Sequence, residues 1–304
     1  MKTKAIQITE KGTLDNLELV HLDIPALGAQ DILVKVKAAG VNPVDFKGVL
    51  NGIFKMPYTL GTDIAGTVEQ VGSEVENFRV GQEVIGSLEW ATQGAFSEYV
   101  VTQERYLALK PHNLTFEEAA AVPLVGLTAW QGLFDHLNVQ AGQKVVIQAA
   151  AGGVGTFAVQ LAKWKGAYVV ALASPKNAPF LTELGADEVV DYKRDDLTEA
   201  VQHMDAAFDS MATSEQLFKM LKKGGRYVSI TAKPSQELAE SYGVSATNFL
   251  FHSDAEQLSQ LVELIEAGKI KVFLDKTFPL AEAKAALEYQ KQGHSRGKNI
   301  ILVD

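Results

Sequence analysis

The sequence predicts an α/β fold in which a doubly wound parallel sheet is joined to a second, β-rich domain. Two patterns carry this prediction: strand-like and helix-like segments alternate from Lys144 onward, and short apolar runs broken by glycine fill the first third of the chain. Strand–helix alternation is typical of βαβ units, which build a parallel sheet with helices on both faces. A length of 304 residues, at roughly 150 residues per domain, also favours two domains.

The first third contains short runs of alternating apolar residues at Asp31–Ala38, Gly66–Val71, Glu83–Ile85 and Phe96–Val101. This spacing predicts a compact β barrel or a curled sheet. No long amphipathic helix is expected before Thr115, where Thr-Phe-Glu-Glu has the pattern of a helix N-cap.

Strands and helices are then expected in turn along the rest of the chain. The expected strands are 144–148, 168–173, 188–192, 205–210, 226–230 and 247–251, and the helices between them include 154–165, 177–184 and 214–221. A helix at 254–267, a strand at 271–278, a helix at 280–291 and a strand at 299–303 follow, and their pattern alone does not assign them to either domain.

The composition excludes several classes of function. A net charge of −9 disfavours a protein that binds a nucleic-acid backbone. The absence of cysteine removes disulfides, thiolate nucleophiles and cysteine-based zinc sites. No apolar run reaches the roughly 18 residues of a membrane span. A soluble, cytoplasmic protein is therefore expected.

The most specific local signal is a glycine-rich turn. An apolar strand from Lys144 runs into Ala151, Gly152, Gly153, Val154 and Gly155, which open an amphipathic helix. Glycine lets the backbone approach a pyrophosphate, and the helix N-terminus offers unpaired N–H groups and partial positive charge. These five residues are predicted to bind a dinucleotide, although alanine stands where the pattern has its first glycine. The alternative is an ordinary strand-to-helix turn.

The end of the next strand indicates which dinucleotide is bound. Enzymes that use NAD usually carry an acid there, which accepts a hydrogen bond from the ribose hydroxyl. This chain has Ser174 and Lys176 instead, and a hydroxyl with an ammonium suits a 2′-phosphate. NADPH is the predicted cofactor. The alternative for Lys176 is a solvated surface residue.

Several short motifs, in order and spacing, resemble the medium-chain dehydrogenase/reductase superfamily, and most closely its zinc-independent quinone oxidoreductase branch, which includes zeta-crystallin. They are Ala39-Gly-Val-Asn-Pro-Val-Asp45, Gly61-Thr-Asp-Ile-Ala-Gly66, Gly126-Leu-Thr-Ala-Trp130, Ala149–Gly155, Leu184-Gly-Ala-Asp187, Gly224-Gly-Arg-Tyr-Val-Ser-Ile230 and Gly293-His-Ser-Arg-Gly-Lys298. The resemblance implies a GroES-like β-barrel domain from residues 1–118 and 256–304, and a Rossmann domain from residues 119–255.

The resemblance also implies roles for single residues. Tyr192 joins Ser174 and Lys176 around the 2′-phosphate, and Arg296 and Lys298 are candidates for the same region. Thr128 and Asn42 match positions near the nicotinamide.

The departures from the superfamily's metal-dependent members are equally informative. Zinc-dependent alcohol dehydrogenases of the superfamily carry a catalytic cysteine where this chain has Asn42, and His-Glu where it has Thr62-Asp63. The six histidines are scattered without the spacing of metal ligands. No metal site is predicted.

A metal-free reductase needs a substrate that delocalises the negative charge brought by the hydride. Quinones and enones do so, because the charge is delocalised onto an oxygen that a few hydrogen-bond donors can stabilise. Direct hydride transfer to a quinone or to the β-carbon of an enone is therefore the predicted reaction. The candidate catalytic residues are Asn42, Lys47, which stands where many relatives have a tyrosine, and Tyr58. Trp90 is a candidate for lining an apolar pocket.

Two other functions remain open. One is a reductase of 2-alkenals or enoyl thioesters, and the other is a non-catalytic NADPH-binding sensor or structural protein. The resemblance also suggests a homodimer, formed through the edge strand Thr247–Phe251.

Overall fold

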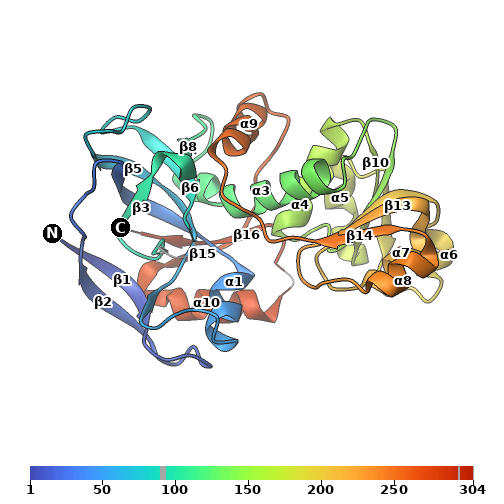
Figure 1. Ribbon diagram of the computed structural model, residues 1–304, viewed down its shortest axis with the longest axis horizontal. Helices are drawn as coiled ribbons and strands as arrows, with labels where there is room; N and C mark the ends of the chain where they lie inside the picture. Colours follow the sequence, from blue (N-terminus) through green and yellow to red (C-terminus); the bar gives the residue numbers. More distant parts are fainter. Residues whose placement is uncertain (90–93, 294, 304) are drawn as a thin grey trace. The chain divides into compact units, whose positions relative to one another are not determined.

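The computed structural model describes residues 1–89, 94–293 and 295–303, and these form two compact units. Unit 1 comprises Met1–Leu124 and Ser253–Asp304, and unit 2 comprises Val125–His252. The sequence placed these boundaries at residues 118/119 and 255/256. In Figure 1 the C-terminal elements, drawn in red, lie with the N-terminal elements, drawn in blue, in unit 1.

Unit 2 contains a six-stranded sheet in which every neighbouring pair of strands is parallel. The strand order is β11-β10-β9-β12-β13-β14. Successive strands are therefore added on one side of β9 as far as β11, and on its other side from β12 to β14. This order is that of the dinucleotide-binding doubly wound fold, which confirms the predicted fold class. The strands are β9 (Lys144–Ile147), β10 (Tyr168–Ala173), β11 (Glu188–Asp191), β12 (Met204–Asp209), β13 (Leu221–Ser229) and β14 (Ser245–Asn248).

The helices of unit 2 bury apolar faces against this sheet. In α4 (Gly153–Trp164) the buried side chains include Phe157 and Leu161, and Gly166, with a φ of +86°, follows the helix end. At Gly132 an added Cβ would lie 2.1 Å from the Phe208 ring, so only glycine allows that close approach. The other helices are α3 (Pro123–Trp130), which begins in unit 1, the π-helical turn Gln131–His136, η3 (Pro175–Asn177), α5 (Ala178–Glu183), α6 (Leu197–Ala200), α7 (Ser214–Met220) and α8 (Gln236–Tyr242).

Unit 1 is built around a seven-stranded sheet and a three-stranded sheet, as the glycine-broken apolar runs predict. The larger sheet has the order β15-β16-β3-β5-β6-β8, with β7 paired to β3. Its strands are β3 (Asp31–Val41), β5 (Asp63–Val71), β6 (Glu83–Ser87), β7 (Tyr99–Gln103), β8 (Leu107–Leu109), β15 (Leu274–Pro279) and β16 (Lys298–Leu302). The smaller sheet contains β1 (Lys2–Ile8), β2 (Leu17–Asp23) and β4 (Tyr58–Thr59).

The helices of unit 1 are short except near its C-terminal end. The expected N-cap is confirmed: Thr115 Oγ1 accepts from the Glu118 N–H, and the Glu118 carboxylate accepts from the Thr115 N–H, at the start of α2 (Phe116–Ala120). The sequence did not anticipate α1 (Pro43–Leu50), which has proline as its first residue. The remaining helices are η1 (Glu104–Tyr106), α9 (Ala255–Glu266), η4 (Leu280–Glu282) and α10 (Ala283–Gln292).

Within the ranges that the structure describes, no helix is both long enough and apolar enough to cross a membrane. Cytoplasmic localisation stays a prediction.

Candidate functional site

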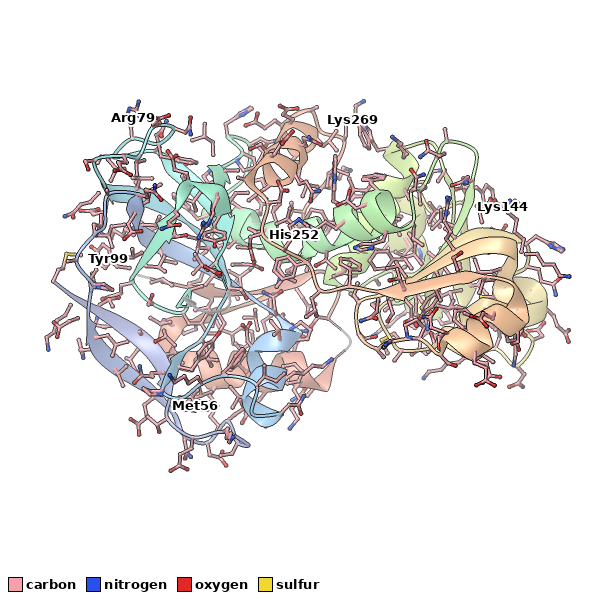
Figure 2. The ribbon with its side chains drawn as sticks, viewed as in Figure 1. Met56, Arg79, Tyr99, Lys144, His252 and Lys269 are labelled. Atoms are coloured by element: carbon pink, nitrogen blue, oxygen red, sulfur yellow. The ribbon has the colours of Figure 1, made fainter. Side chains whose placement is uncertain are left out.

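The glycine-rich turn lies at the carboxyl end of the central strand of unit 2. Strand β9 begins at Lys144, which is labelled in Figure 2, and ends at Ile147. Gly152 is the N-cap of α4 with φ −78° and ψ 176°, a conformation open to any residue. A Cβ added there would meet only the Ala149 carbonyl oxygen, at 3.4 Å. The space in front of Gly152 is therefore free of protein atoms that would exclude a side chain.

Gly155 is needed for a different reason. An added Cβ would lie 2.4 Å from the Ala149 carbonyl oxygen and 2.6 Å from the Ala150 backbone. Gly155 thus lets α4 pack directly on the turn, whereas Gly152 leaves the approach to the turn open.

Three neighbouring strands bring their carboxyl ends together around this turn. The Gln148 N–H donates to the Phe208 carbonyl (2.9 Å), and Ser210 Oγ donates to the Gln148 carbonyl (3.0 Å), which joins the loops after β9 and β12. The Ala150 N–H donates to the Leu172 carbonyl of β10 (3.2 Å). The N-terminus of α4, with the N–H groups of its first turn and its positive dipole end, begins at this edge. This arrangement fits the pyrophosphate of a dinucleotide.

The predicted 2′-phosphate residues lie at adjacent positions on the same edge. Ala173 of β10 is the register partner of Asp191 of β11, so Ser174 and Tyr192 directly follow two paired residues. Ser174 Oγ accepts from the Asn177 side chain (3.3 Å), and Lys176 is exposed. The structure thus groups the three predicted residues.

Sequence reasoning missed other charged groups at the end of β11. The Asp191 carboxylate accepts from the Lys193 N–H (3.0 Å), and the Lys193 ammonium lies 5.7 Å from the centre of the Tyr192 ring. Arg194 is paired with Asp196. The run Asp-Tyr-Lys-Arg-Asp-Asp in the sequence was the available signal.

Asp209, at the end of β12, is a second residue that sequence reasoning missed. Its buried carboxylate accepts from the N–H groups of Met211 and Thr213, both at 2.7 Å, and from the Tyr227 hydroxyl at 2.6 Å. Burial, followed by the bond to Asp209, raises the pKa of Tyr227 above its usual range. Asp209 therefore fixes the loop that follows β12, where the strand order reverses.

The remaining predicted cofactor residues are on separate units. Thr128 lies on α3 in unit 2 and is 4% exposed. Arg296 is exposed and precedes β16 in unit 1. Their roles stay predictions.

Four buried polar residues of unit 1, Asn42, Asp45, Asp63 and Lys298, form what we call the barrel cluster. The Lys298 ammonium donates to Asn42 Oδ1 and to the Val41 carbonyl (2.8 Å), and lies 3.7 Å from Asp63 Oδ2. Asn42 Nδ2 donates to Asp63 Oδ2 (2.9 Å), and Asp63 Oδ1 accepts from the Leu124 N–H (3.0 Å). The cluster joins the end of β3 to the starts of β5 and β16.

This geometry corrects the prediction for Lys298. The sequence analysis placed Lys298 among the 2′-phosphate ligands, which requires an accessible ammonium. The residue is only 4% exposed, and its ammonium is already bonded inside unit 1. The family resemblance suggested this role for Lys298, but it could not show the hydrogen-bond acceptors around the ammonium.

Asp45 completes the cluster from the first turn of α1. Its Oδ2 accepts from the Asn42 N–H (2.7 Å), whereas its Oδ1 has no hydrogen-bond partner among the described residues. Burial raises the pKa of Asp45 to about 7 and also raises the pKa of Asp63, while burial lowers the pKa of Lys298. Asp63 has both oxygens occupied as acceptors, so we assign the charge to Asp63 and the proton to Asp45.

Asp45→Asn is expected to change how stability depends on pH. The folded pKa of Asp45, about 7, lies above the value of 3.8 for an unperturbed aspartate, so the folded state holds this proton more tightly than the unfolded state. The stability that Asp45 contributes is therefore present below the unfolded pKa and lost as pH rises through about 7. Relative to wild type, the variant should gain about 4 kcal/mol in free energy of unfolding between pH 4 and 8. Urea unfolding across this range measures the gain, and a difference independent of pH would contradict the assignment.

The three candidate catalytic residues differ in burial and in surroundings. Tyr58 is half-buried in β4 and stacks on Phe54 with ring centres 4.0 Å apart. Its pKa is raised by burial and then by Asp45, which is ionised at the high pH where a tyrosine titrates. Asn42 is fully buried in the barrel cluster. Lys47 is exposed on α1, where the neighbouring Phe46 and Gly48 are buried. Trp90 lies outside the described residues.

The barrel cluster does not fit a zinc ion. Within residues 1–89, 94–293 and 295–303, no group of three His, Cys, Asp or Glu side chains could hold a metal. Asn42 and Thr62-Asp63 stand where the sequence comparison expects metal ligands in zinc-dependent members. Here the cation among them is the Lys298 ammonium.

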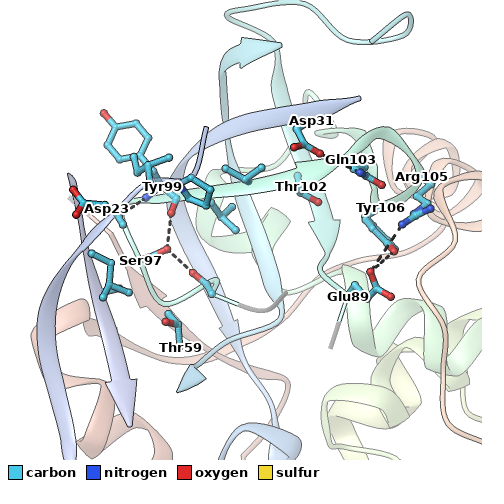
Figure 3. A pocket seen from close by; sticks show the side chains of 18 residues that line it. Asp23, Asp31, Thr59, Glu89, Ser97, Tyr99, Thr102, Gln103, Arg105 and Tyr106 are labelled. Carbon is cyan, nitrogen blue, oxygen red and sulfur yellow. Dashed lines mark hydrogen bonds and ion pairs between the residues drawn. The ribbon is translucent and has the colours of Figure 1, made fainter. Parts of the chain in front are cut away.

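A cavity of about 480 Å³ opens elsewhere in unit 1 (Figure 3). Its polar side chains bond one another: the Tyr106 hydroxyl donates to Glu89 (2.8 Å), and the Gln103 amide donates to Asp31 (3.1 Å). The residues that line it include none of the barrel cluster. The cavity is therefore separate from the candidate site.

Comparison with known proteins places the chain in a family. Residues 28–112 match the model for an alcohol dehydrogenase GroES-like domain, and residues 184–301 match the model for a zinc-binding dehydrogenase. A 2-methylene-furan-3-one reductase of Solanum lycopersicum is 34% identical, over 98% of this chain and 78% of the relative. A chloroplastic NADPH-dependent alkenal/one oxidoreductase of Arabidopsis thaliana is 32% identical, over 98% of this chain and 79% of the relative.

A solved structure agrees with this assignment. The quinone oxidoreductase from Coxiella burnetii superposes with a TM-score of 0.92 at 33% identity and covers 100% of both chains. With the Rossmann strand order of unit 2, the GroES-like match of unit 1 and a lysine in place of metal ligands, the chain belongs to the zinc-independent, quinone oxidoreductase-like branch of the medium-chain dehydrogenase/reductase superfamily.

Proposed function

We propose that this oxidoreductase uses NADPH to reduce quinones or α,β-unsaturated carbonyl compounds without a metal ion. The observation that carries the proposal is the barrel cluster, where a lysine ammonium stands among the positions that hold metal ligands in zinc-dependent members. An acceptor that needs no Lewis acid suits such a site, because a quinone or an enone delocalises the arriving charge. The names of the tomato and Arabidopsis relatives point to enones, and the name of the Coxiella burnetii structure points to quinones.

The residues of unit 2 would bind and orient the cofactor, which when bound supplies a hydride from its nicotinamide ring. The N-terminus of α4 and the open approach at Gly152 would hold the pyrophosphate. Ser174, Lys176 and Tyr192 would hold the 2′-phosphate. Thr128 and the chain around Asn42 would lie at the nicotinamide end, where positioning supplies much of the rate.

The reaction requires little acid–base catalysis from the protein. Hydride addition to the β-carbon of an enone leaves an enolate, and one proton from solvent completes the saturated ketone. A quinone accepts one hydride and one proton to give the hydroquinone. The Tyr58 hydroxyl, whose raised pKa keeps it protonated at neutral pH, is a candidate donor to the enolate oxygen.

Initial rates of NADPH and NADH oxidation, measured with chelator present against quinones, 2-alkenals, other enones and crotonyl thioesters, test this proposal. Turnover that survives the chelator and prefers NADPH is expected, and the fastest acceptor identifies the substrate class. Loss of activity with chelator would overturn the metal-free mechanism. Tight NADPH binding without turnover of any acceptor would instead support a non-catalytic NADPH-binding protein.

Lys176→Glu is expected to weaken NADPH selectively. A carboxylate would repel the 2′-phosphate that the ammonium attracts, so KM for NADPH should rise at least tenfold while KM for NADH changes by less than a factor of three. Lys223→Glu is the matched control. It makes the same charge change on an exposed residue near the amino end of β13, whereas Lys176 follows the carboxyl end of β10. Equal effects of the two variants on NADPH would contradict the phosphate assignment.

A homodimer is proposed through the free edge of the unit 2 sheet. Strand β14 ends the strand order, and Leu250 just beyond it is 77% exposed. The observed strand ends at Asn248, earlier than the predicted Phe251. Light scattering on wild type and on Leu250→Asp is expected to give a dimer and a weakened dimer.

A further inference from the structure

Lys298 carries a buried positive charge that the proposed reaction does not use directly. Its side chain is 5% exposed and that of Asp63 is 0% exposed. Removing two charges from water is costly, and their attraction repays this only when the geometry is good and the remaining donors and acceptors are bonded. The buried Lys298–Asp63 ion pair therefore needs an explanation other than a contribution to stability.

The backbone before Lys298 is shaped to deliver this side chain. Gly297 has a φ of +87°, and a Cβ there would lie 2.2 Å from the Phe273 carbonyl oxygen, so only glycine fits. The Lys298 N–H donates to the same carbonyl (2.9 Å). One residue later, Asn299 pairs with Val41 of β3. The start of β16 is therefore fixed against β3, which ends at Val41, next to Asn42.

The two charged neighbours of Asn42 permit only one orientation of its side-chain amide. The Lys298 ammonium can only donate, so it requires the amide oxygen, whereas the ionised Asp63 carboxylate can only accept, so it requires the amide nitrogen. Turning the amide over would set an NH₂ group against an ammonium and an oxygen against a carboxylate. Lys298 and Asp63 thus act as opposite ends of one clamp.

We propose that Lys298 is a positioning residue that fixes the Asn42 side chain and the adjoining peptide of Val41 at the reacting end of the site. The inference rests on the proposed function, which places the chain around Asn42 at the nicotinamide end. Lys298 reaches both groups at once, through Asn42 Oδ1 and the Val41 carbonyl. Asn42 is also the N-cap of α1, so the clamp fixes the start of that helix as well.

The double variant Lys298→Met with Asp63→Asn separates positioning from stability. It removes one buried positive and one buried negative charge, so neither is left uncompensated, and both replacements keep the size of the side chain. We expect it to fold, with kcat at least tenfold below wild type and KM for NADPH within threefold, because the phosphate groups would be bound by unit 2. A variant that folds and retains kcat within twofold would overturn the proposal.

Lys110→Met is the matched control in the same unit. The Lys110 side chain is 6% exposed, and its ammonium donates to the carbonyls of Pro111 and Leu114, as the ammonium of Lys298 does to oxygens of Val41 and Asn42. It lies outside the barrel cluster, so its loss should leave kcat within twofold of wild type. An equal fall in kcat in the control would assign the effect to general loosening of unit 1 and overturn the proposal.

A second measurement, of hydrogen exchange, uses the wild-type protein alone, without cofactor and without any substitution. In wild type labelled with ¹⁵N-asparagine, the Asn42 side-chain NH₂ should give one pair of signals that exchange with solvent at least 100 times more slowly than those of exposed Asn113. Exchange as fast as that of Asn113 would overturn the clamp. Absence of NADPH turnover in wild type, with the slow exchange intact, would count against the proposed function alone.

Discussion

Replacing Lys298 with methionine, with Asp63 left in place, is expected to lower the free energy of unfolding by about 3 to 5 kcal/mol. The substitution leaves the buried Asp63 carboxylate without its cation, while the apolar stem of the side chain is largely kept. The loss should be greater at pH 8 than at pH 5, because burial raises the pKa values of Asp45 and Asp63, so a lower pH favours their uncharged forms. Calorimetric unfolding at the two pH values measures both effects.

Lys110→Met provides the comparison for this loss. The carboxylate paired with Lys110 belongs to Glu83, whose side chain is 51% exposed, so solvent can stabilise it once the lysine is gone. The control should therefore lose less stability than Lys298→Met, and its loss should depend little on pH. Equal losses for the two variants would mean that the barrel cluster holds no uncompensated charge.

Gly152→Val is expected to weaken NADPH binding at least 100-fold, or about 3 kcal/mol, without unfolding the protein. The backbone at Gly152 suits valine, and the nearest atom to an added Cβ lies 3.4 Å away. The new side chain would instead project into the approach that the pyrophosphate requires. Titration calorimetry with NADPH, together with thermal unfolding of the free protein, measures affinity and stability separately.

Gly155→Ala should give the opposite pattern of effects. Its methyl group would meet the Ala149 carbonyl oxygen at 2.4 Å, so the turn or the helix must shift, at a cost of about 1–3 kcal/mol in stability. Normal NADPH affinity in Gly152→Val, or an unchanged melting temperature in Gly155→Ala, would contradict the roles assigned to the two glycines.

The strand–helix alternation predicted the Rossmann sheet because each element of unit 2 repeats the same local pattern. Prediction was weaker where tertiary contacts decide the structure. Helix α1 has eight residues and follows directly from β3, so its pattern was too short to detect. The π-helical turn Gln131–His136 was not predicted, because Gly132 there packs on Phe208, a residue distant in the sequence.

The same difference between local patterns and long-range contacts applies to the candidate site. The places of the glycine turn and of Ser174 at the ends of strands were predicted correctly, because strand, loop and helix are contiguous in the sequence. The contacts of Lys298 were not predicted, because its partners Asn42 and Asp63 come from the other end of the chain. The loop after β12 was missed because the contacts of Asp209 with Met211, Thr213 and Tyr227 appear only once the strands are assembled.

Transfer of deuterium from NADPH labelled at C4 of the nicotinamide tests the central claim most directly. The reaction would be run with an enone in ordinary water with chelator present, and the product analysed by NMR. Metal-free hydride transfer predicts deuterium from one C4 face at the β-carbon of the saturated ketone, and a solvent proton at the α-carbon. Product without deuterium at the β-carbon, or turnover abolished by the chelator, would contradict the account.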